Sequence, residues 1–340
     1  MVISRDIDRT QWHDLVKKSS TSSWFQTPEA WDFYQSVADE LTPFAYGVVS
    51  DETKELKGVC VGYIVPAVNS KHSIRNSLYR YFTSRAIISG GPMLADDITD
   101  DQLCELLSTL NSQLSTPIYI ETRNFNDYSR WKHIFEQCGF AYQPHYDVIQ
   151  PTATIDQDML YDRRRNIRRS EKRCMQARLI TPDDPKFERY FTQFYSLLSI
   201  LYRKHLHLPL FSQHFFEQLV KQKDAHFFAA ILWDDVVGGE LCVTLNGSIL
   251  YSWYGCRNRD VFRAHPEVLA TYKAIIWARD NGVPKFDFMG AGSPDQPYGV
   301  RDFKMRFGGQ LVEYGRFLHV NAPLRYNFGK TVVKILHSIK

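Results

Sequence analysis

The apolar positions of the chain change between helix spacing and strand spacing every 10 to 20 residues. In the first half, "PEAWDFYQSVADE" predicts a helix with Pro28 in its first turn, and apolar runs predict strands around 44–49 and 58–65. Farther on, "AIISGGP" and "PIYIET" predict strands, and "TDDQLCELLSTLNSQL" and "SRWKHIFEQCGF" predict helices. Short mixed elements of this kind indicate an α/β or α+β protein.

The second half repeats this order of elements. Helices are predicted over "FERYFTQFYSLLSILYRK" and "SQHFFEQLVKQK", and strands over "HFFAAILW", "VVGGELCVTL" and "SILYSWYG", with Asn246–Gly247 as a hairpin turn. Pro266 begins a further helix, Asn281–Gly282 ends it, and "KFDFMG" is the next strand. The repetition predicts an α/β fold with mixed sheets that uses one module twice.

Length and composition support two globular domains. The chain has 340 residues and is 44% hydrophobic, which excludes a disordered chain. We expect a first domain over 1–152, a basic hinge helix over 153–178 and a second domain over 179–340, whose C-terminal segment has the option of packing back on the first domain. No apolar run approaches the roughly 20 residues that span a bilayer. The N-terminus lacks a signal-peptide pattern and the cysteines form no CxxC pair, so we expect a reduced, cytoplasmic protein.

Charge is distributed unevenly although the formal net charge is only +3. Residues 1–162 sum to −9, residues 163–173 to +6 and residues 174–340 to +6. An acidic half is therefore joined to a basic half through a short, strongly basic segment. This asymmetry predicts that the junction and the second half hold an anionic ligand.

Two basic clusters are the candidate anion-binding sites. The first lies in "YDRRRNIRRSEKRC", a predicted helix, and the second in "CRNRDVFRAHPE", just before the helix that Pro266 begins. A helix N-terminus offers free amides and a positive dipole end, so arginines beside it favour phosphate or pyrophosphate binding. The alternative for each cluster is an ordinary solvated segment, and the absence of a Gly-x-Gly turn makes ordinary coenzyme A recognition less expected. The candidate residues are Arg164, Arg168, Arg169, Lys172, Arg257, Arg259 and Arg263.

A third candidate site lies in "FDFMGAGSPDQPYGVRDFKMRFGG". Asp287 is near the end of a buried strand, at the edge where open α/β sheets bind ligands, and Gly290 allows close approach to the backbone. Lys304 lies one turn before Phe307 in an aromatic setting. The alternative is a turn cluster without a role.

These segments carry a resemblance to the Fem-type peptidoglycan aminoacyltransferases. The resemblance spans "WFQTPEAW", "ISGGPML", "RRRNIRRSEK" and "FDFMGA" followed by "GVRDFKMRFGGQLVEYGRF". It implies two tandem domains of the Gcn5-related N-acetyltransferase (GNAT) fold. It also implies that Lys304 is the functional lysine of the family's Phe-Lys box, near the transferred acyl group. The chain departs from the family in having no basic residue in "PEAWDFYQSVADE" and no coiled-coil arm.

We therefore predict an acyltransferase of the aminoacyl or N-acetyl type. An amine of a cell-envelope precursor would attack an acyl group on an anionic carrier, either aminoacyl-tRNA or acyl-coenzyme A, with no tightly bound cofactor. Lys304, Asp287 and Asp302 are the candidate catalytic residues: Lys304 as the cation beside the oxyanion or phosphate, and one of the aspartates as proton acceptor. The candidate carrier and substrate contacts also include Tyr254, Gly290, Phe303 and Arg306.

Two alternative functions remain open from the sequence. The first is an acetyl-coenzyme A-dependent acetyltransferase that acts on a polysaccharide or amino sugar. The second is a non-catalytic RNA-binding protein on the same fold. The spacing of His205, His207 and His214 does not predict a metal site. The C-terminal "NFGKTVVKILHSIK" predicts a closing helix, with peripheral contact at the inner face of the plasma membrane as the alternative.

Overall fold

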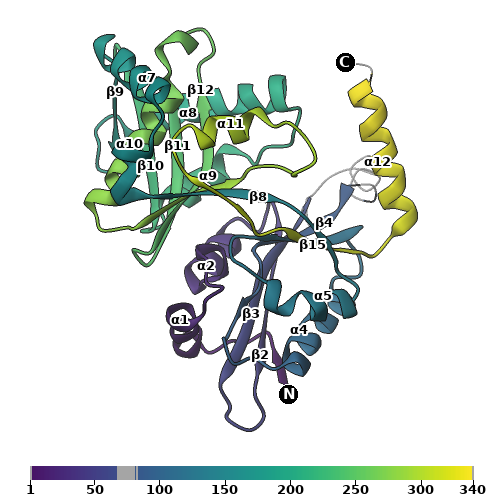
Figure 1. Ribbon diagram of the computed structural model, residues 1–340. Coiled ribbons are helices and arrows are strands. Elements are labelled where there is room, and N and C mark those ends of the chain that lie inside the picture. Colours follow the sequence, from purple (N-terminus) through teal and green to yellow (C-terminus); the bar gives the residue numbers. More distant parts are fainter. Residues whose placement is uncertain (1, 67–80, 82, 339–340) are drawn as a thin grey trace. The chain divides into compact units, whose positions relative to one another are not determined.

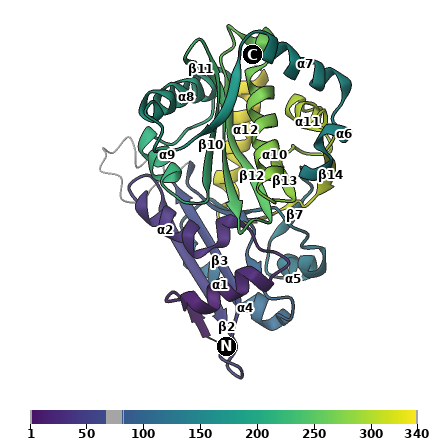
Figure 2. The same ribbon diagram turned by 90° about the vertical axis from the view of Figure 1, so that its left-hand side faces the viewer.

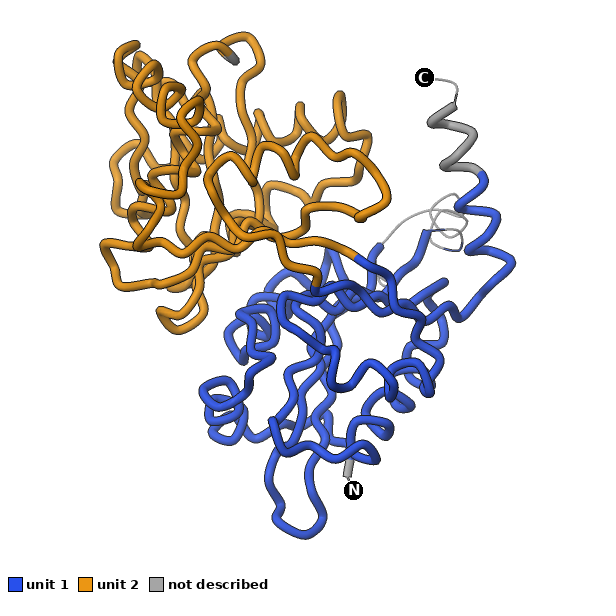
Figure 3. Tube along the Cα trace, viewed as in Figure 1, with its two compact units in different colours: residues 1–144, 314–340 blue, residues 145–313 orange. Residues whose placement is uncertain are grey.

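The computed structural model describes residues 2–66, 81 and 83–338, and it divides into two compact units. Unit 1 comprises residues 1–144 and 314–340, and unit 2 comprises residues 145–313 (Figure 3). The expected division differs from this one at the basic segment, which lies inside unit 2 instead of between domains, and at the first boundary, which falls at residue 144 instead of 152. The chain returns to unit 1 after residue 313, which is the option stated for the C-terminal segment.

Unit 1 is a mixed sheet with helices packed on it. Its strands are β1 (Val2–Ser4), β2 (Thr42–Val49), β3 (Leu56–Val65), β4 (Arg85–Gly90), β5 (Met93–Leu94), β6 (Tyr119–Asn124), β7 (Ala141–Gln143) and β15 (Arg316–Val320). Its helices are α1 (Arg9–Lys18), α2 (Pro28–Ser36), α4 (Asp100–Gln113), α5 (Lys132–Gln137) and α12 (Pro323–Ser338) (Figure 1). The strand order is β1-β2-β3-β4-β6-β15-β7, with β5 paired to β3.

Unit 2 has the same plan. Its strands are β8 (Tyr146–Pro151), β9 (Gln176–Ile180), β10 (Ala225–Leu232), β11 (Asp235–Leu245), β12 (Ile249–Arg257), β13 (Lys285–Gly290) and β14 (Gln310–Glu313). Its helices are α6 (Ile155–Asp158), α7 (Tyr161–Lys172), α8 (Phe187–Leu201), α9 (Gln213–Val220), α10 (Pro266–Asp280) and α11 (Gly299–Met305). The strand order is β14-β8-β13-β12-β11-β10-β9. Among the described strands each unit has one parallel pair, β4 with β6 and β12 with β13, whose strands are joined through α4 and α10 respectively.

Local sequence explains most of these elements. Thr99 caps α4 with a full capping box to Gln102, and Pro28 and Pro266 stand in the first turns of α2 and α10. Asn246 and Gly247 both have positive φ, as a two-residue hairpin between β11 and β12 requires. The structure thus confirms the predicted helix starts at Pro28 and Pro266 and the predicted hairpin turn at Asn246–Gly247. The short helix α11 replaces part of what the sequence predicts as a glycine-rich loop.

The two faces of the unit 2 sheet are covered by different helices, α8 and α10 (Figure 2). Neighbouring glycines of β11 show this, because their side-chain positions point to opposite faces. A Cβ on Gly239 would meet Phe194 of α8 at 2.7 Å, and one on Gly238 would meet Pro266 of α10 at 2.9 Å. Glycine at both positions therefore lets the helices pack directly on the strand. The side chain of Glu240, the next residue, points to the α10 face.

One interior strand of the unit 1 sheet comes from outside the unit's main run of chain. β15 follows unit 2 yet pairs with β6 and β7 in unit 1, whereas β8 begins unit 2 and pairs with β13 and β14 of the same unit. Phe317 of β15 is fully buried and stacks on Phe135 with ring centroids 4.0 Å apart. β15 is thus part of the core of unit 1.

This packing predicts a large and local stability effect. Phe317→Ala should lower the free energy of unfolding by about 3–5 kcal/mol, because it leaves a cavity between β15 and α5. Urea denaturation measures the loss, and hydrogen exchange should locate it in β6, β7 and α5. Leu324→Ala is the control, since Leu324 is 87% exposed. An unchanged unfolding midpoint for Phe317→Ala would contradict this account of the core.

Candidate functional site

The two parallel strands of unit 2 separate after a short pairing. β12 extends over Ile249–Arg257, but its pairing with β13 covers only the first three residues and ends at Tyr251 and Asp287. Beyond that point β13 continues through Phe288 to Gly290 with an irregular register against β8. The separation lies at the carboxyl ends of two parallel strands, where open α/β sheets bind ligands.

Lys304 of α11 holds the separated end of β13. Its ammonium donates to the carbonyl oxygens of Phe288, Met289 and Gly290 at 2.6, 3.2 and 2.8 Å. An ammonium has three protons, so these bonds engage its whole donor capacity. Met289 takes a positive φ of 59°, a strained conformation for a side chain of this size, and the lysine compensates by binding the carbonyls around it.

Lys304 is the centre of a buried group of charges. Burial lowers its pKa, while the carboxyls of Asp147, Asp287 and Glu240 act to raise it. Asp287 is fully buried, and burial raises its pKa to about 7 against the opposing effects of the Met289 amide and Lys304. The Met289 N–H donates to one oxygen of Asp287 at 2.5 Å. Within the described residues, the other oxygen has no hydrogen-bond partner.

Unit 1 has an acid at the corresponding position, Glu121, but its pKa is lowered instead of raised. Glu121 is the third residue of β6, as Asp287 is of β13, and it pairs with the parallel strand in the same way. Two guanidiniums contact it, Arg123 at 2.9 Å and Arg316 at 2.8 Å. Burial acts to raise the pKa of Glu121, but the two arginines outweigh burial and the net pKa is lowered. Within the part of the chain that the structure describes, unit 2 alone therefore combines a buried acid of raised pKa with a lysine on the strand end.

Unit 1 also fills the space next to its parallel strands with its own side chains. Tyr128 donates to the carbonyl oxygens of Gly90 and Pro92. A Cβ on Gly90 would clash with the Ser23 hydroxyl, and one on Gly91 would lie 2.6 Å from the Tyr128 hydroxyl. The turn after β4 is thus packed shut by protein atoms.

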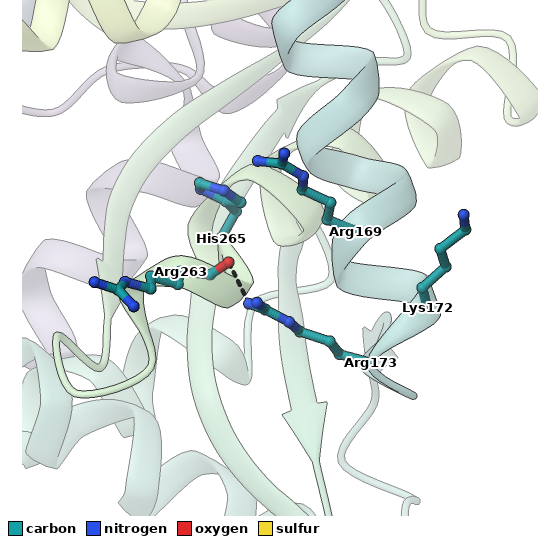
Figure 4. A pocket seen from close by; sticks show the side chains of 5 residues that line it. All are labelled: Arg169, Lys172, Arg173, Arg263 and His265. Carbon is teal, nitrogen blue, oxygen red and sulfur yellow. Dashed lines mark hydrogen bonds between the residues drawn. The ribbon is translucent and has the colours of Figure 1, made fainter.

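A basic cavity lies at the N-terminus of α10 in unit 2. It has a volume of about 560 Å³ and is lined by Arg169, Lys172, Arg173, Arg263 and His265. Figure 4 shows that these side chains come from the end of α7 and from the loop before α10. The guanidinium of Arg173 donates to the Arg263 carbonyl, and the Ser170 hydroxyl donates to the Ala264 carbonyl at 2.6 Å. These two bonds fasten α7 to the loop.

The electrostatic field at the cavity is positive. Burial lowers the pKa of His265, and the charges of Arg163, Arg169, Arg173 and Arg257 lower it further. His265 also takes a left-handed conformation as the residue before α10. Its carbonyl accepts hydrogen bonds from the Val268 and Leu269 amides at 3.1 and 3.2 Å, and Pro266 has no N–H, so the cavity depends on charge more than on backbone donors. The positive end of the helix dipole and the surrounding cations together favour an anion.

Arg163 connects the basic helix to the Phe-Lys segment. It is 5% exposed, its guanidinium lies 4.5 Å from the Phe303 ring centroid and 4.7 Å from that of Phe307, and it donates to the Phe303 carbonyl at 2.8 Å. Burial lowers its pKa to about 10. Stacking of this kind fixes α7 against α11 and so relates the cavity to Lys304.

The structure brings together only some of the predicted residues. Arg169, Lys172 and Arg263 line one cavity, Lys304 binds the Gly290 carbonyl and interacts with Asp287, and Phe303 stacks on Arg163. Other predicted residues have different neighbours. Arg164 donates to the Asp156 carbonyl. Arg257 forms an ion pair with Glu267, and Arg306 forms one with Asp162. Tyr254 packs on Phe216 toward α8 and α9, and the side chains of Arg168, Arg259 and Asp302 are exposed.

Sequence reasoning missed Arg163, Arg173, His265 and Glu240. Glu240 had a usable signal, because it is the single charged residue in the apolar run from Val236 to Leu245. Arg163, Arg173 and His265 stand beside predicted residues, but their roles follow from the packing of α7 on the loop before α10. Among the described residues, no group of three or more His, Cys, Asp or Glu side chains could hold a metal ion. No helix in the described part of the chain is long and apolar enough to cross a membrane.

Comparison with known proteins agrees with this geometry. Residues 162–305 match the model of an acetyltransferase (GNAT) domain. The match begins in α7 and ends in α11, so it includes the basic cavity, the strand separation and Lys304. No curated protein matches the chain.

Solved structures share the fold over nearly the whole chain. The crystal structure of FemX is similar with a TM-score of 0.68 at 14% identity, covering 97% of this chain and 100% of that one. The C-terminal domain of a putative lysylphosphatidylglycerol synthetase from Agrobacterium fabrum has a TM-score of 0.60 at 9% identity, with 96% of each chain covered. A tandem GNAT protein from the clavulanic acid biosynthesis pathway has a TM-score of 0.55 at 10% identity, with 92% and 94% covered.

These likenesses confirm the predicted fold and the resemblance to the Fem-type proteins at the level of the fold. The chain has the tandem GNAT fold, and residues 162–305 form an acyltransferase domain of the GNAT type.

Proposed function

We propose that the protein transfers an acyl or aminoacyl group from an anionic carrier to an amine of a cell-envelope precursor in the cytoplasm. The observation that carries this proposal is the basic cavity at the N-terminus of α10, in the same unit as the strand separation that Lys304 holds. The cavity would bind the phosphates of the carrier, and the strand separation would receive the activated acyl group. Unit 1 has no comparable opening next to its described parallel strands, because Tyr128 and Ser23 fill that space.

Two carriers remain in competition. The match of residues 162–305 to an acetyltransferase domain favours acyl-coenzyme A, whose pyrophosphate would suit a helix N-terminus lined with arginines. The exposed side chains of Arg165 and Arg168 continue the positive surface along α7 beyond the cavity, and this extension favours the longer phosphate track of aminoacyl-tRNA. Direct binding of acetyl-coenzyme A and of charged tRNA separates the two.

The acceptor is proposed by analogy with similar structures. One is FemX and another is a putative lysylphosphatidylglycerol synthetase, a name that denotes aminoacyl transfer to a membrane lipid. An amine of a cell-envelope precursor is the substrate class that we infer from the first. Contact with the inner membrane surface through the C-terminal helix stays a prediction, because the side chains of 332–340, on which it depends, lie outside the described residues.

Lys304 would act mainly by shaping the site. Its three ammonium protons bind the carbonyls of Phe288, Met289 and Gly290, so a direct bond to substrate would require it to release one of them. Its charge would still stabilise negative charge on the carbonyl oxygen during transfer. We therefore assign it to positioning the end of β13 and to electrostatic stabilisation, in place of a phosphate contact.

Charge reversal at the cavity should weaken carrier binding. Lys172→Glu and Arg263→Glu should each raise the Kd of the true carrier about tenfold or more, because each replaces an attractive charge by a repulsive one. Isothermal titration with acetyl-coenzyme A and filter binding with charged tRNA provide the measurement. Lys221→Glu is the matched control, since Lys221 is exposed at the end of α9. Equal affinity in all three variants would contradict the assignment of the cavity.

Removal of the Lys304 ammonium should affect the rate more than the affinity. Lys304→Met should lower kcat about 100-fold or more, since it removes the cation and frees the strand end, and should change the Kd of the carrier less than threefold. Lys285→Met, an exposed lysine at the start of the same strand, is the control. A normal kcat with a weakened Kd would show that Lys304 contacts the carrier phosphate instead. Salt-dependent tRNA binding without turnover of any donor would favour a non-catalytic RNA-binding protein.

A further inference from the structure

Glu240 is a buried carboxyl near Lys304 that has no part in binding the end of β13. It lies in the middle of β11, is 5% exposed and points to the face that α10 covers. Burial of a carboxyl is costly unless hydrogen bonds or charges compensate for the lost water. Its partners therefore indicate what the group is for.

Hydroxyl groups bind both oxygens of this carboxyl. Ser252 of β12 donates to Oε1, and Thr271 of α10 donates to Oε2 at 3.0 Å. Gly255 lies opposite Glu240 on β12, and a Cβ there would come within 2.8 Å of Oε2. Glycine at 255 thus leaves room for the carboxyl, while the two hydroxyls fix its orientation.

The surroundings of Glu240 bring the pKa of its carboxyl close to neutral pH. Burial raises its pKa to about 7, and the Ser252 and Thr271 hydrogen bonds and the charge of Lys304 lower it only in part. The neighbouring thiols of Cys242 and Cys256 have raised pKa values themselves, so they stay protonated. On β10 the residue opposite is Phe228, which carries no charge. The carboxyls of Asp147 and Asp287 interact with the same Lys304 ammonium and act, as Glu240 does, to raise its pKa.

Ser252 connects this carboxyl to the strand separation. It directly follows Tyr251, the last residue of β12 that pairs with β13, and its side chain is only partly buried. The register of β12 against β11 shifts next to it, between the pairs Leu241–Tyr254 and Cys242–Ser252. A bulge of this kind re-aims side chains at strand ends. Ser252 is therefore the first residue of β12 beyond the pairing with β13, next to the strand separation proposed to receive the acyl group.

We propose that Ser252 and Glu240 together accept the proton that the acceptor amine loses, an inference that rests on the proposed acyl transfer. The amine nitrogen forms a bond to the acyl carbon, and the bond from that carbon to the carrier oxygen or sulfur breaks. The amine proton passes to the Ser252 oxygen while the Ser252 proton passes to Oε1 of Glu240. The carrier takes up a proton from solvent, and Glu240 later releases its own to solvent, so the reaction balances without an additional reactant.

Asp287 is less suited to this step. It is fully buried, one of its oxygens binds the Met289 amide, and Lys304 shares its charge. No hydroxyl links it to the strand end among the contacts of the described residues. We assign Asp287 to stabilising the end of β13 that Lys304 binds. We assign Ser252 and Glu240 to accepting the proton of the amine.

Kinetics of two substitutions test the pair. Glu240→Gln keeps the shape but cannot accept a proton, so kcat should fall about 100-fold or more while the Kd of the carrier stays within about twofold. The parent rate should rise with pH through about 7, and this rise should be absent in the variant. Ser252→Ala should lose a similar factor, and Ser252→Thr, which keeps the hydroxyl, should recover most of it. Glu188→Gln and Ser196→Ala, both on α8 away from the α10 face, are the controls.

Thermal unfolding as a function of pH checks the state of Glu240 without turnover. Because the folded-state pKa is raised, the folded protein binds more protons than the unfolded chain between about pH 4.5 and 7, and the parent loses stability as pH rises through that window. Glu240→Gln removes this loss. The midpoint of the variant relative to the parent should therefore rise from pH 4.5 to pH 7 and then level off.

The outcomes separate the two levels of the argument. If the parent turns over and Glu240→Gln and Ser252→Ala match it, the pair is overturned and the proposed function stands. Losses of kcat that are uniform across pH, with no recovery by Ser252→Thr, indicate a structural role and also overturn the pair. If the parent binds no carrier and transfers no acyl group, the proposed function fails and the pair fails with it. A relative midpoint for Glu240→Gln that falls as pH rises would contradict the buried neutral carboxyl.

Discussion

The ammonium of Lys304 and the three backbone carbonyls at the end of β13 form the interaction on which the site of unit 2 depends. Two parallel strands that stay paired leave no room for a ligand between them. Here the pairing ends at Tyr251 and Asp287, and the freed carbonyls of β13 need donors because buried polar groups are costly without partners. One lysine supplies all three donors. The strand separation is therefore a stable part of the fold.

The two units show how one module serves two purposes. Both have an acid at the third position of the second parallel strand. In unit 1, Arg123 and Arg316 neutralise Glu121, and Tyr128 fills the turn beside it. In unit 2, burial raises the pKa of Asp287, and Lys304 holds the end of β13. Basic side chains line a cavity at the N-terminus of α10. The physical difference lies in what compensates the buried charge, and it concentrates the proposed chemistry in unit 2.

Much of the fold could be predicted from the sequence, because helix starts at Pro28 and Pro266 and the Asn246–Gly247 turn are local signals. The pairing of β15 with β6 and β7 could not, since pairing of distant strands leaves no mark in a local window. Three residues of the predicted basic clusters, Arg169, Lys172 and Arg263, line the cavity. The sequence alone could not distinguish these cavity residues from Arg257 and Arg306. Those two arginines form ion pairs with Glu267 and Asp162, and the pairs arise only on folding. The donor bonds of Lys304 also follow from tertiary structure.

Hydrogen exchange of the whole chain with and without carrier tests the central claim most directly. Acetyl-coenzyme A and charged tRNA are the two probes, each added in excess to the parent protein. The account predicts that one of them slows exchange in residues 161–173 and 258–266 and along β12 and β13. Protection confined to unit 1, or no protection by either probe, would contradict the claim that unit 2 binds an anionic acyl carrier.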